Sequence, residues 1–144
     1  MSPELNLMFR LSVEVGVPVE QGTFEGQRRR LVSILGGTVS GPRFEGRILP
    51  GGADWQTLRE TDGNTRAFAR YLIEHADGTV IEVTNPGIRR GPPEVMARLA
   101  AGERVDPDAY YFRTSPAFQA PPGPHDWLNQ NTFVGVGQRW PRSV

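Results

Sequence analysis

Turn-forming residues recur along the chain at short intervals, and this spacing constrains the fold more than any other feature. Glycine-rich or proline-containing turns fall at Gly36-Gly37, Pro50-Gly51-Gly52, Asp62-Gly63 and Asp77-Gly78. Several of the segments between turns alternate apolar and polar residues, which is the period of a half-buried β-strand. About eight strands at this spacing predict an all-β domain, built as a sandwich or a barrel.

Strands are expected at residues 9–15, 30–35, 39–48, 53–60, 66–76, 79–85, 109–114 and 129–138. Glycines inside strand-like sequence, such as Gly41 and Gly46, indicate bulges or bends where a sheet must curve. One short α-helix is predicted near residues 93–101, because Pro93 suits a first helical turn and Gly102 suits the residue after a helix end. The helix either caps the barrel or serves as a plain crossover connection.

Length and charge limit the classes of protein to consider. A chain of 144 residues with 38% hydrophobic content is long enough for one domain with a real core, over residues 1–144. The formal net charge is zero, so neither nucleic acid nor an anionic membrane is an expected partner. Met1 to Arg10 lacks the pattern of a secretion signal, and no apolar run is long enough to span a membrane, which predicts a cytoplasmic protein.

Missing residue types restrict the chemistry. The chain has no cysteine, and all 16 of its basic residues are arginine. Thiolate chemistry, zinc–thiolate sites, Schiff bases and lysine-dependent phosphate loops are therefore excluded. His75 and His125 lie far apart in the sequence and lack the spacing of a metal-ligand pair. We therefore expect no metal site and no cofactor.

Hairpin geometry predicts which polar side chains share one face of the sheet. A two-residue turn at Asp77-Gly78 places Arg70 opposite Asn85. A three-residue loop over residues 61–63 places Asp54 opposite Arg70, whereas a four-residue loop sets two arginines against each other, which is less favourable. The expected result is a row of three side chains, Asp54, Arg70 and Asn85, with Gln56 one step along the same face.

This row supports two interpretations. An arginine that faces the core needs a partner, and Asp54 with Arg70 forms either a structural ion pair or part of a ligand site. In the second case Asp54 and Arg70 are the catalytic residues: Asp54 acts as a general base or proton relay, and Arg70 stabilises a developing oxyanion. Gln56 and Asn85 then bind and orient the substrate.

Several motifs resemble those of one bacterial and fungal family. They are Gly36-Gly37-Thr38, Gly46, Leu49-Pro-Gly-Gly-Ala-Asp-Trp-Gln56, Ala69-Arg-Tyr71, Asp77-Gly78, Gly91-Pro92-Pro93, Tyr111-Phe-Arg113, and Trp127-Leu-Asn129 with Phe133-Val-Gly135. The chain resembles this family, DUF3237 or UPF0311, from about Phe9 to Arg139. The resemblance implies a single antiparallel up-and-down, calycin-like β-barrel with a ligand-sized cavity, and it leaves self-association as a homo-oligomer open. It implies no settled activity.

The end of the chain departs from the family pattern. Family members continue after the strand at Gly135-Val-Gly137 into a last strand that closes the barrel, whereas here the sequence ends at Trp140-Pro-Arg-Ser-Val144. A gap, a short final strand or a partner chain could occupy that edge.

Three further residues are candidates for substrate binding. Tyr111 and Arg113 alternate to one face and could supply a phenol acid and an anion clamp, or lie on the surface. Trp127 could stack on an aromatic ligand or pack in the core.

The function that these observations favour is binding of a small organic metabolite in a cofactor-free barrel. Without metal, thiol or lysine, the chemistry expected is acid–base catalysis of the isomerase, hydratase, cyclase or lactone hydrolase type. The alternative is a non-catalytic carrier that releases its ligand unchanged. A third hypothesis is an assembly protein that docks a partner on an exposed strand edge.

Overall fold

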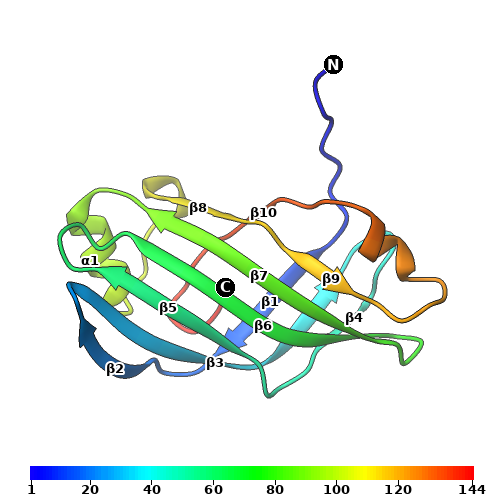
Figure 1. Ribbon diagram of the computed structural model, residues 1–144, viewed down its shortest axis with the longest axis horizontal. Coiled ribbons are helices and arrows are strands. Elements are labelled where there is room, and N and C mark those ends of the chain that lie inside the picture. Colours follow the sequence, from blue (N-terminus) through cyan, green and yellow to red (C-terminus); the bar gives the residue numbers. More distant parts are fainter.

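The computed structural model describes residues 1–144, and a ten-stranded antiparallel sheet curls into a barrel (Figure 1). The strands are β1 (Arg10–Val15), β2 (Val19–Phe24), β3 (Gln27–Ser40), β4 (Gly46–Ile48), β5 (Ala53–Arg59), β6 (Thr65–His75), β7 (Val80–Arg90), β8 (Tyr111–Thr114), β9 (Ala117–Gln119) and β10 (Gly135–Val136). The helical elements are the α-helix α1 (Pro93–Ala100) and the 3₁₀ segments η1 (Pro107–Ala109) and η2 (Asp126–Gln130). The predicted all-β barrel with one short helix is confirmed.

Three long strands, β3, β6 and β7, form the frame of the barrel. Short strands lie end to end beside them: β1 and β2 pair with the two halves of β3, while β4 and β5 fill the space between β3 and β6. On the other side of the frame, β8 and β9 pair in turn along β7. Every pair joins strands that are one or two places apart in the chain, as in an up-and-down barrel.

The last residues of the chain close the barrel. After β10 pairs with β8, the C-terminal segment crosses to β1, where Val13 N–H donates to Val144 O at 2.8 Å and Val15 N–H donates to Arg142 O at 3.0 Å. Val144 N–H returns a bond to Val13 O at 2.9 Å. The C-terminal residues therefore fill this edge through backbone hydrogen bonds and an isolated bridge between Glu14 and Ser143, without forming a further strand.

Several predicted boundaries are wrong. Gly36 and Gly37 do not end a strand, because β3 continues through them and bends there. The strand expected over residues 129–138 shrinks to β10, since η2 and irregular backbone take up the rest. The strand β2 was missed because all six of its residues are exposed and so carry no apolar alternation.

Both predicted hairpin registers are wrong by one residue. The β5–β6 loop spans four residues and closes with a 3.0 Å bond from Arg59 N–H to Asn64 O, so Asp54 lies opposite Ala69. The β6–β7 turn spans three residues and closes between His75 and Thr79, so Ala69 lies opposite Asn85. Gly63 and Gly78, at φ of 75° and 91°, supply the left-handed residue that each turn requires.

The two register errors cancel between β5 and β7. Asp54 and Asn85 remain in one row across the sheet, as predicted, but the residue between them is Ala69 and not Arg70. Because side chains alternate strictly along a strand, a slip of one residue turns Arg70 to the outer face.

The helix α1 covers one end of the barrel (Figure 1). Its eight residues bury Met96 and Leu99 against Val105, Tyr110 and Phe112, which form a small apolar cluster. A larger apolar core of 13 residues, including Ile73, Ile81 and Phe118, fills the interior away from this cluster. No helix in the structure is both long and apolar enough to cross a membrane.

The bend in β3 depends on Gly37. Its φ of 143° is unfavourable for other residues, and a Cβ atom there would collide with the backbone carbonyl oxygen of Ser12. We expect Gly37→Ala to lower the free energy of unfolding by about 2 kcal/mol or more. Gly16→Ala is the matched control, because its Cβ would meet Ser33 Cβ at an ordinary 3.7 Å.

Urea unfolding followed by circular dichroism measures both variants. The control is expected to stay within about 1 kcal/mol of the wild type. Equal stability of the two variants would contradict the role given to Gly37.

Candidate functional site

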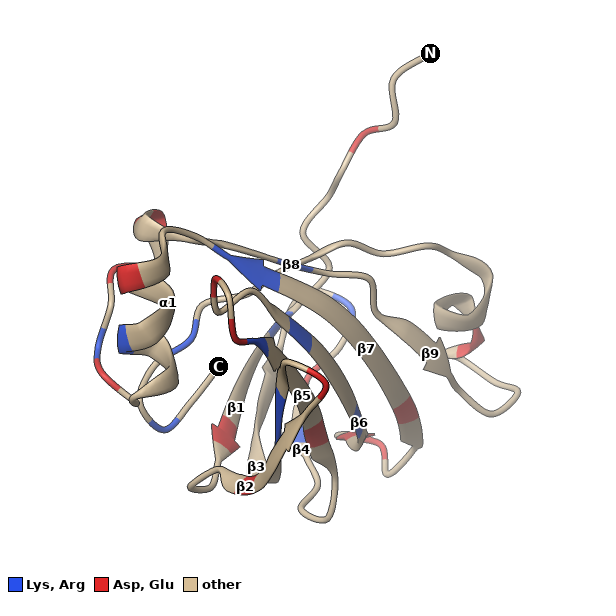
Figure 2. Cartoon of the chain, turned by 60° about the vertical axis from the view of Figure 1, so that its left-hand side comes forward, with Lys and Arg blue, Asp and Glu red and all other residues tan.

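Toward the α1 end, the inward-facing positions of the barrel change from apolar to polar. Along β7 the inward side chains run from Ile81 and Val83 in the apolar core to Asn85 and then to Arg89, which is 1% exposed. Arg30 of β3, Gln56 of β5 and Arg139 near the C-terminus are also buried. Figure 2 shows the basic segment at the end of β7 beside α1. These polar residues, together with Asp54 and the inward-facing Tyr71, are called the polar layer. Burying charged groups in it costs free energy unless they are paired or hydrogen-bonded.

Asp54 is the acidic group of this layer, and two donors hold its carboxylate. Gln56 Nε2 donates to Asp54 Oδ2 at 2.8 Å, and the backbone N–H of Phe68 donates to Oδ1 at 2.9 Å. Gln56 Oε1 in turn accepts from Arg30 Nε at 2.9 Å, and Arg30 Nη1 donates to the carbonyl of Ala100 at 3.1 Å. A continuous set of hydrogen bonds thus connects Asp54 to the end of α1.

Burial changes the acidity of two groups in this region. It raises the pKa of Asp54 despite the opposing effects of the Gln56 hydrogen bond and the charge of Arg89. Burial and the negative charge of Asp54 also raise the pKa of Tyr71, an inward residue of β6 that is 6% exposed. Asp54 is therefore a stronger base than an exposed carboxylate, and Tyr71 keeps its proton at neutral pH.

Two buried arginines in the layer have no ion-pair partner. Neither Arg89 nor Arg139 forms a salt bridge with a carboxylate. Arg30, by contrast, has its Nη1 atom 3.7 Å from Oε1 of Glu20. Burial and the charges of Arg139 and Arg30 lower the pKa of Arg89 to about 10, so it remains a cation at neutral pH. The layer carries more positive than negative charge in a buried setting.

Two buried side-chain atoms in the structure lack a hydrogen-bond partner, and both belong to this layer. They are Nε of Arg89 and Oδ1 of Asn85, a donor and an acceptor four residues apart in β7. Unpaired buried polar atoms are costly and uncommon in native proteins. Ala69, which lies between Asn85 and Asp54, contributes only a methyl group to the same row. Arg89 Nε can donate to an anionic or carbonyl oxygen of a small molecule, and Asn85 Oδ1 can accept from a hydroxyl group of the same molecule.

The predicted pairing of Arg70 with Asp54 is wrong. Arg70 lies on the outer face of β6, where Nε and Nη2 donate to Glu82 Oε1 at 2.8 and 2.6 Å. Its side chain is 67% exposed. The register of the two hairpins, described above, is the cause.

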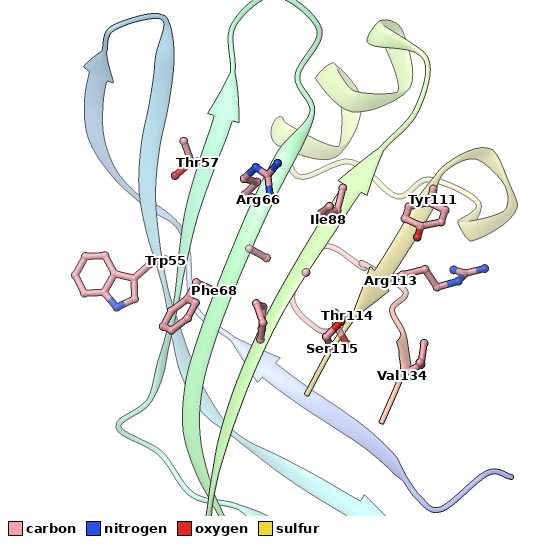
Figure 3. Close-up of a pocket in the computed structure, with 13 residues that line it drawn as sticks. Trp55, Thr57, Arg66, Phe68, Ile88, Tyr111, Arg113, Thr114, Ser115 and Val134 are labelled. Carbon is pink, nitrogen blue, oxygen red and sulfur yellow. The ribbon is translucent and has the colours of Figure 1, made fainter. Parts of the chain in front are cut away.

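Tyr111, Arg113 and Trp127 do not join the polar layer. Tyr111 and Arg113 line a groove of about 740 Å³ on the outer face of the sheet, together with Trp55 and Phe68 (Figure 3). Trp127 packs against the apolar core, with the guanidinium of Arg43 stacked 3.8 Å from its ring centroid. Of the seven predicted site residues, Asp54, Gln56 and Asn85 are brought together.

Sequence reasoning missed four members of the layer: Arg30, Tyr71, Arg89 and Arg139. Arg89 could have been found by continuing the alternation of β7 past Pro86, since Ile81, Val83, Asn85, Gly87 and Arg89 share a face. Correct turn lengths would have placed Tyr71 inside. Arg139 follows β10 in irregular backbone, so no periodicity marks it.

The fold and this layer define the class of protein: an antiparallel β-barrel with a charged, partly unpaired interior. Residues 3–144 match the family described as "Protein of unknown function (DUF3237)", and the chain belongs to that family. A UPF0311 protein of Clostridium acetobutylicum is 40% identical over 138 residues, covering 95% of this chain and 87% of the relative. The crystal structure of a protein of unknown function from Rhodopseudomonas palustris superposes with a TM-score of 0.89 at 38% identity, covering 99% of this chain and 94% of that one. The predicted family is confirmed.

A more distant similarity is to Penicillium herquei proteins. The hydroalkoxylation enzyme phnH is 34% identical over 82 residues, covering 57% of this chain and 54% of phnH. The crystal structure of an enzyme from the same fungus has a TM-score of 0.65 at 26% identity, covering 96% of this chain and 90% of that one.

The raised pKa of Asp54 predicts a specific pH dependence. A folded state that binds the Asp54 proton more tightly than the unfolded state loses stability as pH rises through the interval between the two pKa values. Asp54→Asn removes this loss. We therefore expect the melting temperature of the variant, relative to wild type, to increase between about pH 3.5 and pH 7.

Differential scanning calorimetry of both proteins across this range provides the measurement. Carboxylates whose pKa is lowered, such as Asp77 and Glu20, are present in both proteins and cancel in the difference. If the melting temperature of Asp54→Asn relative to wild type falls as pH rises, the pKa of Asp54 is lowered in the folded protein, not raised.

Proposed function

We propose that this barrel binds a small organic anion or carbonyl compound in its polar layer and catalyses a proton-transfer reaction on it without a cofactor. The observation that carries the proposal is the buried arrangement of Asp54, a base of raised pKa, near Arg89 and Arg139, two buried cations that form no salt bridge. A stable core gains little from such an arrangement, whereas a ligand with a negatively charged oxygen would satisfy it.

Each residue of the layer takes a role that fits its contacts. Asp54 accepts a proton from the substrate, and Arg89 and Arg139 stabilise the negative charge that develops on its oxygen. Asn85 binds the substrate through its unpaired Oδ1. Gln56 uses both ends of its amide on Arg30 and Asp54, so it positions the base and does not bind substrate directly. Tyr71 is the proton donor.

The similarity to phnH narrows the reaction class. Hydroalkoxylation adds an alcohol O–H across a carbon–carbon double bond with no net oxidation or reduction, so it needs no redox partner. In the proposed barrel chemistry, Asp54 takes the hydroxyl proton as the C–O bond forms, and the electron pair of the double bond moves to a conjugated carbonyl held by the arginines. Tyr71 then protonates carbon and recovers its proton from Asp54, so protons balance over the cycle.

A groove beside α1 supports entry from that end of the barrel. It has a volume of about 340 Å³ and lies between α1 and the β5–β6 loop, with Met96, Gly63 and Leu58 in its lining. Arg30 anchors the end of α1 through Ala100, so displacement of the helix would open the polar layer. The helix thus serves as a cap in the proposal.

The proposal is tested with three variants, in each of which the new side chain is similar in size to the one it replaces. Arg89→Met removes the unpaired cation, Asp54→Asn removes the base, and Arg70→Met is the control on the outer face. Small carboxylates, phenols and unsaturated hydroxy-ketones are screened by thermal shift, and hits are incubated and analysed by mass spectrometry and chromatography. A substrate is expected to stabilise wild type and Arg70→Met but not Arg89→Met.

Asp54→Asn is expected to retain binding and to lose turnover by about 100-fold or more, as for the loss of a general base. Without ligand, Arg89→Met should keep its free energy of unfolding within about 1 kcal/mol of wild type or exceed it, because it replaces a buried unpaired charge by an apolar side chain. A loss of several kcal/mol on this substitution would make Arg89 a structural residue and overturn the proposal.

The carrier alternative gives a distinct result in the same experiment. A carrier returns its ligand unchanged, and Asp54→Asn then has no effect on the compound recovered. The expected homo-oligomer stays a prediction, and the exposed aromatic side chains of the outer groove in Figure 3 are the apolar surface at which to test it first.

A further inference from the structure

The two histidines of the chain meet at the end of the barrel opposite α1. His75 is the last residue of β6, and His125 directly precedes η2. Their ring centroids are 4.1 Å apart, although the sequence separates them widely and predicts no metal-ligand pair. Asp77, in the β6–β7 turn, completes the cluster: its Oδ2 lies 2.7 Å from Nε2 of His125.

The cluster presents one ligand atom from each of three residues. These three atoms lie within 4.8 Å of one another. In a tetrahedral site with metal–nitrogen bonds of 2.0–2.1 Å, ligand atoms lie roughly 3.3 Å apart. Side-chain rotations that move the three ligand atoms by about 1 Å would therefore bring them to bonding distance from one ion. Asp77 can make this movement because its side chain is 40% exposed at a hairpin turn.

The surroundings hold the ligands in place. Phe44, which is 1% exposed, packs edge-on against both imidazoles, with ring centroids 4.8 Å from His75 and 5.6 Å from His125. The loop that carries His125 is pinned by Asn129, whose side chain forms hydrogen bonds of 2.7 and 2.9 Å with the backbone of Ala120. His125 itself is 6% exposed. Preorganisation of this kind lowers the cost of binding an ion.

The Asp77 carboxylate is positioned to act as a metal ligand. Asp77 Oδ1 accepts the backbone N–H of Thr79 at 2.9 Å, which leaves Oδ2 directed at His125. His75 Nδ1 accepts the backbone N–H of Asp77 at 3.0 Å and lies 3.2 Å from Asp77 Oδ1.

We propose that His75, Asp77 and His125 form a binding site for a divalent transition-metal ion of the zinc type. Two imidazole nitrogens and one carboxylate oxygen suit Zn²⁺, Co²⁺ or Ni²⁺, whereas Mg²⁺ and Ca²⁺ prefer ligand sets made of oxygen alone. Three protein ligands leave at least one coordination position for water or another ligand.

This site is separate from the polar layer. Ala69, which faces Asp54, precedes His75 by six residues in β6, a distance of roughly 20 Å along an extended strand. The ion would join the end of β6, the β6–β7 turn and the loop before η2, three segments that lie together at one end of the barrel (Figure 1).

The test uses the tag-free full chain, freed of metal with a chelator, and Zn²⁺ alone as the probe. Isothermal titration calorimetry is expected to show one ion per chain with a Kd of about 1 µM or tighter. His125→Gln and His75→Gln are each expected to weaken binding by about 100-fold or more. Asp126→Asn, which changes an acid beside His125 but outside the cluster, is the control and should bind as the wild type does.

A measurement on the wild type keeps the test decisive where a variant does not fold. Because the chain has two histidines, all imidazole ¹⁵N signals in its nuclear magnetic resonance spectrum belong to the cluster. Both histidines are expected to shift on addition of one equivalent of Zn²⁺. Imidazole signals that stay in place, or no binding tighter than about 100 µM, would overturn the proposal, as would unchanged affinity in folded His125→Gln.

Discussion

The electrostatic relation between Asp54 and the buried arginines is the constraint on which the proposed site depends. Arg30, Arg89 and Arg139 place three positive charges in the interior, and Asp54 is the acid whose charge acts on both Arg89 and Arg139. Burial raises the pKa of Asp54, while the charges of Arg89 and Arg139 lower it. Neither effect removes the excess of positive charge, so the interior favours an anionic occupant.

The barrel can hold this layer because stability is supplied elsewhere. The apolar core at one end and the cluster beneath α1 at the other bury the large hydrophobic side chains. Gln56 and Arg30 connect the layer to α1 through hydrogen bonds, so the same contacts that fix Asp54 also fix the helix. Proteins commonly place such locally unfavourable groups at functional sites and offset their cost in the surrounding fold.

The fold class could be predicted from sequence because strand alternation and turn residues are local signals. Register could not, because it depends on whether a turn contains two, three or four residues, and Asp77-Gly78 fits both a two-residue turn and the three-residue turn observed. That difference exchanged Ala69 for Arg70 on the inner face. Arg89 was not predicted as an inward residue because Pro86 normally ends a strand, whereas here Pro86 lies within β7. The meeting of His75 with His125 is purely tertiary and left no sequence pattern.

A double-mutant cycle on Asp54 and Arg89 tests the central claim most directly. The free energy of unfolding is measured by urea denaturation for wild type, Asp54→Asn, Arg89→Met and the double variant. If the two charges act on each other in the interior, the double variant is more stable than the sum of the single effects by about 1 kcal/mol or more. Additivity within about 0.5 kcal/mol would show that Asp54 and Arg89 are energetically independent, and would contradict the account.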